Sequence, residues 1–502
     1  MQSLKEILGN ESPKDRGAFV GGKWTQEGEK HGQIEVLSPA NSEWKLPSLE
    51  FSYDVVDSLV VEARKAFLAW RDLAVPKRIE ALQSFAKELD KRQDLIAKLI
   101  AIENGKPFDE AKVEASLLSK KINITIDYAL NLVKTQKLEL GAFGVGEIHW
   151  RPKGILAVIG PFNFPVHLSH GHIAPALLTG NVCVLKPSEK TPYCAQVYME
   201  AAEASLLPKG VLQMLQGDAQ VARRLIRHVD LDGVLATCSY EVGAKIQKDL
   251  AEKPEKIVAL EMGGKNAAIL WEIEDEEQAA KDLIRSSFLS TGQRCTALSR
   301  IYVKKALLDS LMGRVHQMAK ELVIDQPFAE SPKPFMGPLI SEDSLKKYLR
   351  YAKIAETDSE TEAIMRPKRL LGEARQIEHA LPQGNYVSPS INYVKKWDAK
   401  SAYQNHEIFA PDMFFCPIDS IDEGIEAVNN NPYGLSFSLF CKEEKIFDQV
   451  ADKIDCGLIY WNRPTVGASS QLPFGGWKRS GNHKPAGAFA IYASTQVQTR
   501  VK

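Results

Sequence analysis

One cysteine of the chain stands in a setting that raises the question of covalent chemistry. Cys295 lies in "STGQRCTALSR", between an arginine and a threonine and shortly after Gly292. A free cysteine is usually a small buried hydrophobe, so the residue type alone favours a place in the core. The alternative is that Cys295 is a nucleophile. Polar residues elsewhere in the chain distinguish a core cysteine from a nucleophilic one.

Two such residues follow runs that are typical of buried strands. Glu261 comes after "KIVAL" and before Met262 and two glycines, and apolar surroundings raise a carboxyl pKa toward the range of a general base. Asn163, in "GPFNFP", lies in a stiff loop that can hold its amide toward an oxyanion. The alternatives are a structural hydrogen bond for the glutamate and a turn position for the asparagine.

Further polar residues follow other predicted strands. Lys186 and Glu189, in "VLKPSEKTP", can grip a nucleotide ribose, although a bare charge pair is more often a solvated loop. Ser239, in "TCSYEVG", stands where a helix begins, and that end of a helix favours a phosphate. Most serines at such positions are helix caps and nothing more.

The elements that position these residues follow from apolar spacing. Residues 55–135 predict a helical bundle, with one segment opening at Pro76 and stopping at Gly105. From residue 154 short β-rich runs alternate with helical segments, which predicts parallel βαβ units whose ligands bind at the carboxyl ends of the strands. A second alternating stretch begins near residue 266, and residues 330–380 are expected to form surface loops.

Composition narrows the class of protein. A chain of 502 residues with 44% hydrophobic and 25% charged residues predicts two or three globular domains. The net charge of -1 does not indicate a basic surface that would bind nucleic acid or an acidic membrane. No apolar run is long enough to span a membrane. Seven cysteines without a CxxC pair favour a reducing cytoplasm over a disulfide framework. We therefore expect a cytoplasmic protein that acts on small molecules.

Six motifs, taken together, resemble the aldehyde dehydrogenase superfamily. They occur in the family's order, and the likeness extends from "FVGGKW" near the start to "LPFGGWKRSG" near the end; the six are "GPFNFP", "LKPSEKTP", "LEMGGKN", "STGQRC", "HEIFAP" and "NNNPYGLSFSLF". The resemblance implies an α/β fold with a Rossmann-like cofactor domain, a second α/β catalytic domain and a β-arm for oligomerisation. The boundaries that follow are 1–129 with 151–261 for the NAD-binding domain, 262–465 for the catalytic domain, and 130–150 with 485–502 for the arm.

The same resemblance implies roles for individual residues. Cys295 aligns with the catalytic thiol, Glu261 with the general base, and Asn163 with the oxyanion donor. A second group aligns with cofactor-binding positions; its members are Lys186, Glu189, Cys238, Ser239, Gly243, Glu407 and Phe409. The presence of Glu261 favours hydrolysis of a thioacyl enzyme over transfer to coenzyme A. Glu189 would repel a ribose 2′-phosphate, so NAD is favoured over NADP.

One position departs from the family pattern. The family usually has glycine where this chain has Cys238, and glycine lets the backbone approach the cofactor without a side chain. The cysteine is expected either to narrow the pyrophosphate site or to shift how the cofactor lies. The resemblance implies a homodimer or a homotetramer, assembled through the arms.

Within the superfamily, "SGNHKP" and the stretches around it resemble most the N-succinylglutamate 5-semialdehyde dehydrogenases of arginine catabolism. An aldehyde of that kind is anionic and calls for cationic or amide donors. The candidate substrate residues are Arg463, Ser469, Ser470 and His483. For Arg463 and His483 the alternative is a place on the surface or in a subunit contact.

Alternatives remain for the activity and for three histidines. Glutamate 5-semialdehyde dehydrogenases of proline catabolism share the "GQRC" and "PFGGWK" segments, but "NHKP" departs from them. A Cys-His thiol hydrolase needs no dinucleotide site, and an inactive relative would have lost Cys295 or Glu261. The spacing of His167, His170 and His172 is poor for one helical face, so no metal site is expected.

Overall fold

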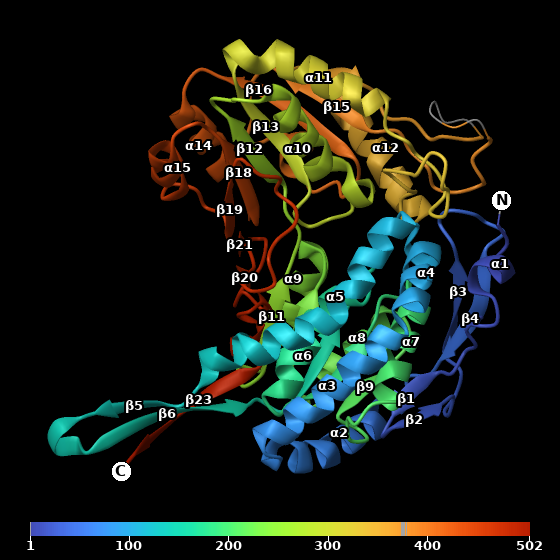
Figure 1. Cartoon of the computed structure of the whole chain (residues 1–502), viewed down its shortest axis with the longest axis vertical. Helices are drawn as coiled ribbons and strands as arrows, with labels where there is room; N and C mark the ends of the chain where they lie inside the picture. Colours follow the sequence, from blue (N-terminus) through green and yellow to red (C-terminus); the bar gives the residue numbers. More distant parts are fainter. Residues whose placement is uncertain (1, 373–376, 378) are drawn as a thin grey trace.

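Two large sheets, each covered by helices, form the body of the molecule, and a long β-arm projects from it (Figure 1). The structure is a computed structural model that describes residues 2–372, 377 and 379–502. The predicted α/β class, with two α/β units and an arm, is confirmed. The predicted domain boundaries stay a prediction.

The first sheet carries the strands that were expected between residues 154 and 261. In spatial order its strands are β11 (Ile257–Glu261), β10 (Gly233–Thr237), β7 (Ile155–Ile159), β8 (Val182–Lys186), β9 (Leu212–Met214), β1 (Ala18–Val20) and β2 (Lys23–Thr25). The five strands from β11 to β9 pair in parallel, as predicted. Every residue of β7 and β8 is buried, since helices cover both faces of the sheet.

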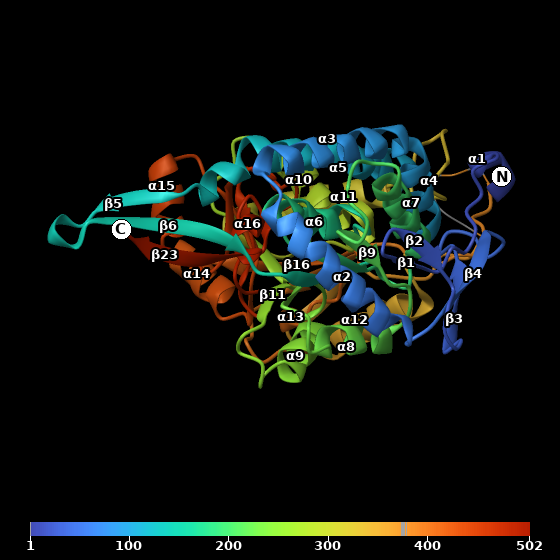
Figure 2. The same ribbon diagram turned by 90° about the horizontal axis from the view of Figure 1, so that it is seen from below.

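Helices flank this sheet on two sides. Figure 2 places α3 and α5 on one side and α8 and α9 on the other. The helices are α2 (Val55–Asp72), α3 (Val75–Lys91), α4 (Gln93–Asn104), α5 (Phe108–Asp127), α6 (His167–Leu178), α7 (Pro192–Glu203), α8 (Ala219–Arg227) and α9 (Tyr240–Asp249). The segment predicted from Pro76 to Gly105 is divided at Arg92, whose φ of -103° and ψ of 5° separate α3 from α4.

The second sheet lies in the other half of the chain. Its strands, in spatial order, are β14 (Thr361–Met365), β15 (Ser390–Val394), β16 (Asp412–Ile418), β13 (Leu298–Lys304), β12 (Asn266–Leu270), β18 (Ser436–Phe440) and β19 (Leu458–Trp461). All neighbouring strands pair in parallel except β14 with β15. The helices around it are α10 (Glu276–Phe288), α11 (Leu308–Lys320), α12 (Glu342–Thr357), α13 (Ala402–Asn405), α14 (Ile421–Asn429) and α15 (Glu444–Ala451).

The expectation of surface loops over residues 330–380 is wrong in its middle part. Helix α12 occupies residues 342–357 and begins at Ser341, whose hydroxyl accepts a hydrogen bond from the Ser344 N–H. Its buried side chains, Leu345, Tyr348, Tyr351 and Ala355, recur at helical spacing between many charged residues. The charged majority hid that stripe. Residues 373–376 and 378 of the predicted loop segment lie outside the described residues.

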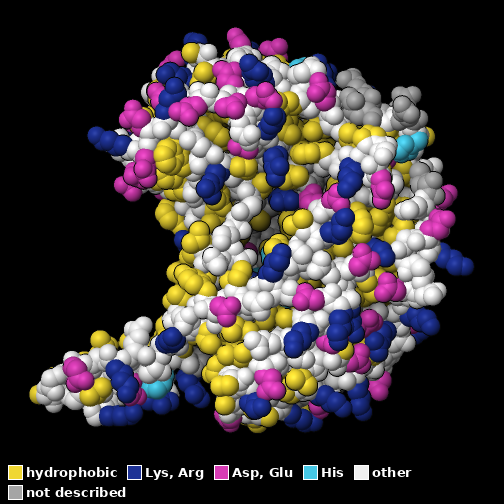
Figure 3. All heavy atoms as spheres, in the orientation of Figure 1, with side chains coloured by type: hydrophobic (Ala, Val, Ile, Leu, Met, Phe, Trp, Pro, Cys, Tyr) yellow, Lys and Arg dark blue, Asp and Glu magenta, His cyan; other side chains and the backbone are white. Residues whose placement is uncertain are grey.

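The arm is a three-stranded antiparallel sheet. Strand β6 (Val145–Pro152) lies between β5 (Gln136–Glu139) and β23 (Thr495–Val501), so the two predicted arm segments pair within one chain. Figure 3 shows hydrophobic side chains on the projecting arm, and Phe143 at its tip is 81% exposed. The predicted homodimer or homotetramer stays a prediction.

Smaller elements complete the fold. They are α1 (Leu4–Leu8), β3 (Gly32–Leu37), β4 (Lys45–Phe51), β17 (Tyr433–Gly434), β20 (Pro473–Phe474), β21 (Trp477–Lys478), β22 (Ala486–Gly487) and α16 (Ala490–Ala493). Short 3₁₀ turns cover residues 129–133, 141–143, 289–292 and 305–307. In the described residues, no helix combines the length and the apolar character that crossing a membrane requires.

Candidate active site

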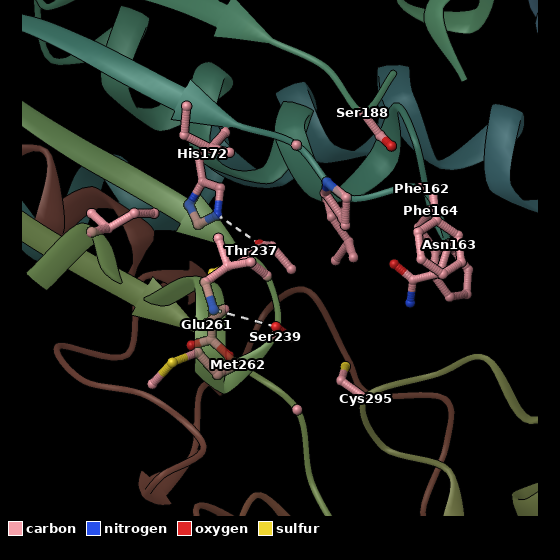
Figure 4. Close-up of a pocket in the computed structure, with 18 of the residues that line it drawn as sticks. Phe162, Asn163, Phe164, His172, Ser188, Thr237, Ser239, Glu261, Met262 and Cys295 are labelled. Carbon is pink, nitrogen blue, oxygen red and sulfur yellow. Dashed lines mark hydrogen bonds between the residues drawn. The ribbon is translucent and has the colours of Figure 1, made fainter. Parts of the chain in front are cut away.

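A cavity of about 1380 Å³ gathers most of the predicted site residues. It is lined from the first sheet's carboxyl edge, from the Cys295 loop and from the loop that precedes β20. Figure 4 shows the thiol of Cys295 and the amide of Asn163 entering this cavity, with Glu261 on its other side. The three predicted catalytic residues come from three different segments of the chain, and the fold brings them together.

Hydrogen bonds to main-chain oxygens fix the Cys295 loop from both sides. The Asn266 side chain donates from Nδ2 to the carbonyl oxygens of Cys295, at 2.7 Å, and Ala297, at 2.9 Å. Thr465 Oγ1 donates to the carbonyl oxygen of Thr296 at 2.8 Å. Burial, with Glu261 and Glu407 nearby, raises the pKa of the Cys295 thiol to about 12. The resting residue is therefore a thiol, and its proton must leave during attack.

The loop that carries Asn163 is held just as firmly. Lys106 Nζ donates to the Asn163 carbonyl oxygen at 2.8 Å, and Asn104 Nδ2 donates to the Phe162 carbonyl oxygen at 2.9 Å. The Asn163 amide donates to the carbonyl oxygen of Gln293 at 3.0 Å. That bond uses one of the two hydrogens on the amide nitrogen, and the other remains for an oxyanion.

Glu261 ends strand β11 and differs from its partners in the cavity. Its side chain is 4% exposed, and within the described chain neither carboxylate oxygen has a hydrogen-bond partner. Burial raises the pKa of Glu261 well above its usual range, while Lys484 acts in the opposite direction. A side chain at Gly475 would put its Cβ 2.6 Å from Glu261 Oε1, so that glycine leaves room for the carboxylate. The arrangement suits a group that takes up protons.

The predicted cofactor residues line the part of the cavity beyond β8 and β10. Lys186 ends β8, and its Nζ lies 3.5 Å from a carboxylate oxygen of the more exposed Glu189. Ser239 caps α9 by accepting from the Val242 N–H at 3.3 Å, and Cys238 lines the cavity beside it. A Cβ at Gly243 would lie 2.4 Å from the sulfur of Met262, so glycine permits α9 to pack against the strand end.

Glu407 and Phe409 complete this set near the nucleophile. The Gly264 N–H donates to Glu407 Oε1 at 3.0 Å, and burial raises the pKa of Glu407 to about 7. Phe409 has a φ of 62° and its ring meets that of Phe162 edge-on at 5.9 Å. The N-terminus of α9 for phosphates, carboxylates for ribose hydroxyls and an aromatic ring all fit a nicotinamide dinucleotide.

The predicted substrate residues divide into two pairs. Ser469 and Ser470 line the cavity. Arg463 and His483 are exposed and are not among the residues that line it. The roles predicted for that second pair stay predictions.

Two of the three clustered histidines, His170 and His172, bond to neighbouring groups of the fold. His170 bonds to the Tyr198 hydroxyl at 2.8 Å and to the Leu118 carbonyl oxygen at 2.9 Å. His172 Nε2 lies 3.1 Å from the Thr237 hydroxyl oxygen, a contact drawn in Figure 4. His167 lines the cavity. The described residues contain no cluster of ligands able to hold a metal ion.

Sequence reasoning missed residues of helices α5 and α6 that line the substrate end. Leu117 and Lys121 come from α5, and His167 and Leu168 come from α6. A signal for Lys121 existed, because it falls in the buried stripe of α5 that contains Leu118.

Comparisons with known proteins identify the family of this chain. The model of the aldehyde dehydrogenase family matches residues 24–500. The chain is 36% identical to N-succinylglutamate 5-semialdehyde dehydrogenase of Novosphingobium aromaticivorans, over 88% of this chain and 92% of that protein. It is 38% identical to N-succinylglutamate 5-semialdehyde dehydrogenase 1 of Caulobacter vibrioides, over 87% and 89% of the two chains.

Solved structures show the same architecture. Lactaldehyde dehydrogenase from Escherichia coli superimposes with a TM-score of 0.89 at 25% identity, covering 97% of this chain and 99% of that one. An NAD-dependent aldehyde dehydrogenase from Sinorhizobium meliloti also gives a TM-score of 0.89 at 25% identity, covering 97% and 94% of the two chains. The protein belongs to the aldehyde dehydrogenase family and is an NAD(P)-dependent enzyme.

Proposed function

We propose that the protein oxidises N-succinylglutamate 5-semialdehyde to the carboxylic acid with NAD, through a thioacyl intermediate on Cys295. The observation that carries the hydrolytic chemistry is the buried carboxylate of Glu261, which has no hydrogen-bond partner among the described residues. The choice of aldehyde is supported by relatives of that name, which match about nine-tenths of the chain.

The first step forms a bond between sulfur and the aldehyde carbon. As Cys295 attacks, its thiol proton passes to a base, and Glu261 is the carboxylate whose charge acts most strongly on the thiol. The carbonyl oxygen gains the electron pair and becomes an oxyanion. The free hydrogen of the Asn163 amide and the Cys295 backbone N–H then stabilise it.

The dinucleotide residues have separate tasks. Lys186 and Glu189 hold the adenosine ribose, the start of α9 at Ser239 receives the pyrophosphate, and Glu407 with Phe409 orients the nicotinamide ribose and ring. Bound NAD supplies the acceptor for the hydride that the substrate carbon loses. The Glu189 carboxylate repels a 2′-phosphate, which favours NAD over NADP.

The last step hydrolyses the thioester. Glu261 takes a proton from water, the hydroxide oxygen bonds to the acyl carbon, and the carbon–sulfur bond breaks to release the acid and Cys295. Between the two steps the Glu261 carboxyl releases the thiol proton to solvent, so the same carboxylate accepts a proton first from the thiol and then from water.

The experiment is NAD reduction by the purified protein with N-succinylglutamate semialdehyde and, separately, with glutamate semialdehyde. We expect a preference for the succinylated aldehyde and loss of at least about 10³-fold in rate for Cys295→Ala. Cys456→Ala, which removes a buried thiol outside the cavity lining, serves as the matched control and should retain activity. Preference for glutamate semialdehyde would indicate the reaction of proline catabolism and would contradict the proposed substrate.

A further inference from the structure

A lysine at the substrate end of the cavity carries a charge with no partner of opposite sign. Lys121, on α5, is 3% exposed and lines the cavity. Its Nζ donates to the carbonyl oxygen of Gly487 at 2.8 Å. An ammonium has three hydrogens, and across the described residues no carboxylate forms an ion pair with this one.

The acidic and basic groups around Lys121 do not supply that partner. Glu114, the buried carboxylate of the same helix, pairs with Lys106 at 2.6 Å. The neighbouring imidazoles of His167, His170 and His172 have pKa values lowered to about 4, 3 and 4, mainly by burial and in part by the charge of Lys121. These rings are neutral at physiological pH, so they neither oppose an incoming anion nor compensate for the ammonium.

Neighbouring groups complete a pocket at this place. His167 also lines the cavity, and its Nδ1 is buried with no hydrogen-bond partner in the described chain. Gly487 belongs to β22, which pairs with β20 just after the loop that carries Ser469 and Ser470. The lysine, an imidazole with an unused nitrogen and two serines therefore line the same cavity.

We propose that Lys121, with His167 beside it, binds a carboxylate of the aldehyde substrate and selects anionic semialdehydes over neutral aldehydes. The inference rests on the proposed function and names the residue that recognises the substrate's charge. Burying an unpaired charge is unfavourable, and a ligand that brings the missing anion removes that penalty only when it binds. A neutral aldehyde leaves the ammonium uncompensated.

The test compares the wild-type protein with Lys121→Met, Lys121→Arg and Lys120→Met. Lys120 is the adjacent, exposed lysine of the same helix and gives a matched control. The substrates are N-succinylglutamate semialdehyde, succinate semialdehyde and butanal. For Lys121→Met we expect KM to rise roughly 10- to 100-fold with the anionic aldehydes, the scale of a lost charge-assisted hydrogen bond, while kcat/KM for butanal stays within about twofold.

Lys121→Arg should recover part of the affinity, and Lys120→Met should behave as wild type. An equal loss with butanal and with the anionic aldehydes would reduce Lys121 to a structural tie to Gly487 and overturn the inference. If the wild-type protein prefers succinate semialdehyde to N-succinylglutamate semialdehyde, the proposed substrate is wrong. In that case the effect of Lys121→Met on the preferred anion still decides the role of the lysine.

Glutarate binding gives a second measurement that needs no turnover and no stable variant. Burial lowers the pKa of Lys121 to about 8, so the ammonium loses its proton as pH rises through that value. The dissociation constant of glutarate, measured calorimetrically on the wild-type protein, should increase roughly tenfold or more between pH 7.5 and 9.5. Burial also lowers the pKa of Lys265 to about 8, but this lysine already lies beside the carboxylate of Asp412. Lys265 is unchanged in all the variants. A wild-type affinity that does not change with pH contradicts the proposal.

Discussion

The two sides of the reacting centre differ in how firmly they are held. Around Asn163 and Cys295, buried side chains bind the main-chain oxygens of both loops. Glu261, across the cavity, has a fixed backbone at the end of β11 and a carboxylate without a hydrogen bond in the described structure. The contrast separates the place where charge develops from the place where protons move.

Each arrangement suits its task. An oxyanion hole works when its donors are already oriented, because no reorganisation is then needed as charge appears. A base that serves first a thiol and then a water molecule must change partners, and a strong structural hydrogen bond would oppose that change. Gly475, which leaves space beside Glu261 Oε1, is consistent with this freedom.

The largest effect that tests the contrast is expected from Glu261→Gln. Glutamine can accept a proton neither from the thiol nor from water, so we expect steady-state turnover to fall about 10³-fold and the burst of NADH to become slower as well. Rapid-mixing absorbance measures the burst and the later rate separately. Glu103→Gln is the matched control, since burial also raises the pKa of Glu103 to about 7 but its carboxylate caps α7 outside the cavity.

The pH dependence of hydrolysis belongs to the same prediction. Burial raises the Glu261 pKa, so the residue stays protonated at pH values where an ordinary glutamate is ionised, and it becomes a base only as pH rises. The thioester hydrolysis rate of the wild-type protein should therefore increase with pH, and that of Glu261→Gln should not. Loss of the burst itself in Glu261→Gln would mean that thiol activation depends wholly on this carboxylate.

A smaller effect, of a different kind, is expected from Asn163→Ala. Loss of one oxyanion donor should slow formation of the thioester about 10²-fold, so the burst becomes slow. Single-turnover NADH formation is the measurement, and NAD affinity measured by fluorescence should hardly change. A burst as fast as in the wild type would show that the Asn163 amide does not stabilise the oxyanion.

The sequence predicts the three catalytic residues but gives no role to Lys121. Cys295, Glu261 and Asn163 follow strands or lie in short motifs, and each stretch of chain carries its own signal. Lys121 has no such motif, because its meaning depends on the approach of β22, which is more than 300 residues away in the chain. Its place in the buried stripe of α5 was a usable clue, yet a lysine in a charged helix resembles a solvated side chain.

The architecture was predictable for a related reason. Alternation of apolar strands with helices sets the parallel sheets locally, whereas α12 was hidden by charges that surround its buried stripe. His483 is exposed although its neighbour Asn482 bonds to Leu260 of the first sheet, a contact between distant segments that no short pattern encodes. Local spacing thus predicts elements and motifs, and long-range packing decides which side chains reach the cavity.

The smallest effect is expected from a residue that acts through another. Asn104 is a positioning residue, because its amide holds the Phe162 carbonyl oxygen at 2.9 Å and touches no reacting atom. Asn104→Ala should slow the burst roughly tenfold by loosening the loop of Asn163. Asn181→Ala removes an equally buried amide that binds the Lys153 N–H at 2.7 Å, outside the cavity, and should lower the melting temperature without slowing the burst.

A double-mutant cycle sharpens this prediction. If Asn104 acts by orienting Asn163, then Asn104→Ala costs nothing further once Asn163 is alanine, because the orientation of an absent amide cannot matter. The burst rate of the double variant should therefore equal that of Asn163→Ala. Additive losses would mean instead that Asn104 supports the nucleophile loop or the cofactor by another route, and the firm side of the reacting centre would then extend beyond the oxyanion donor.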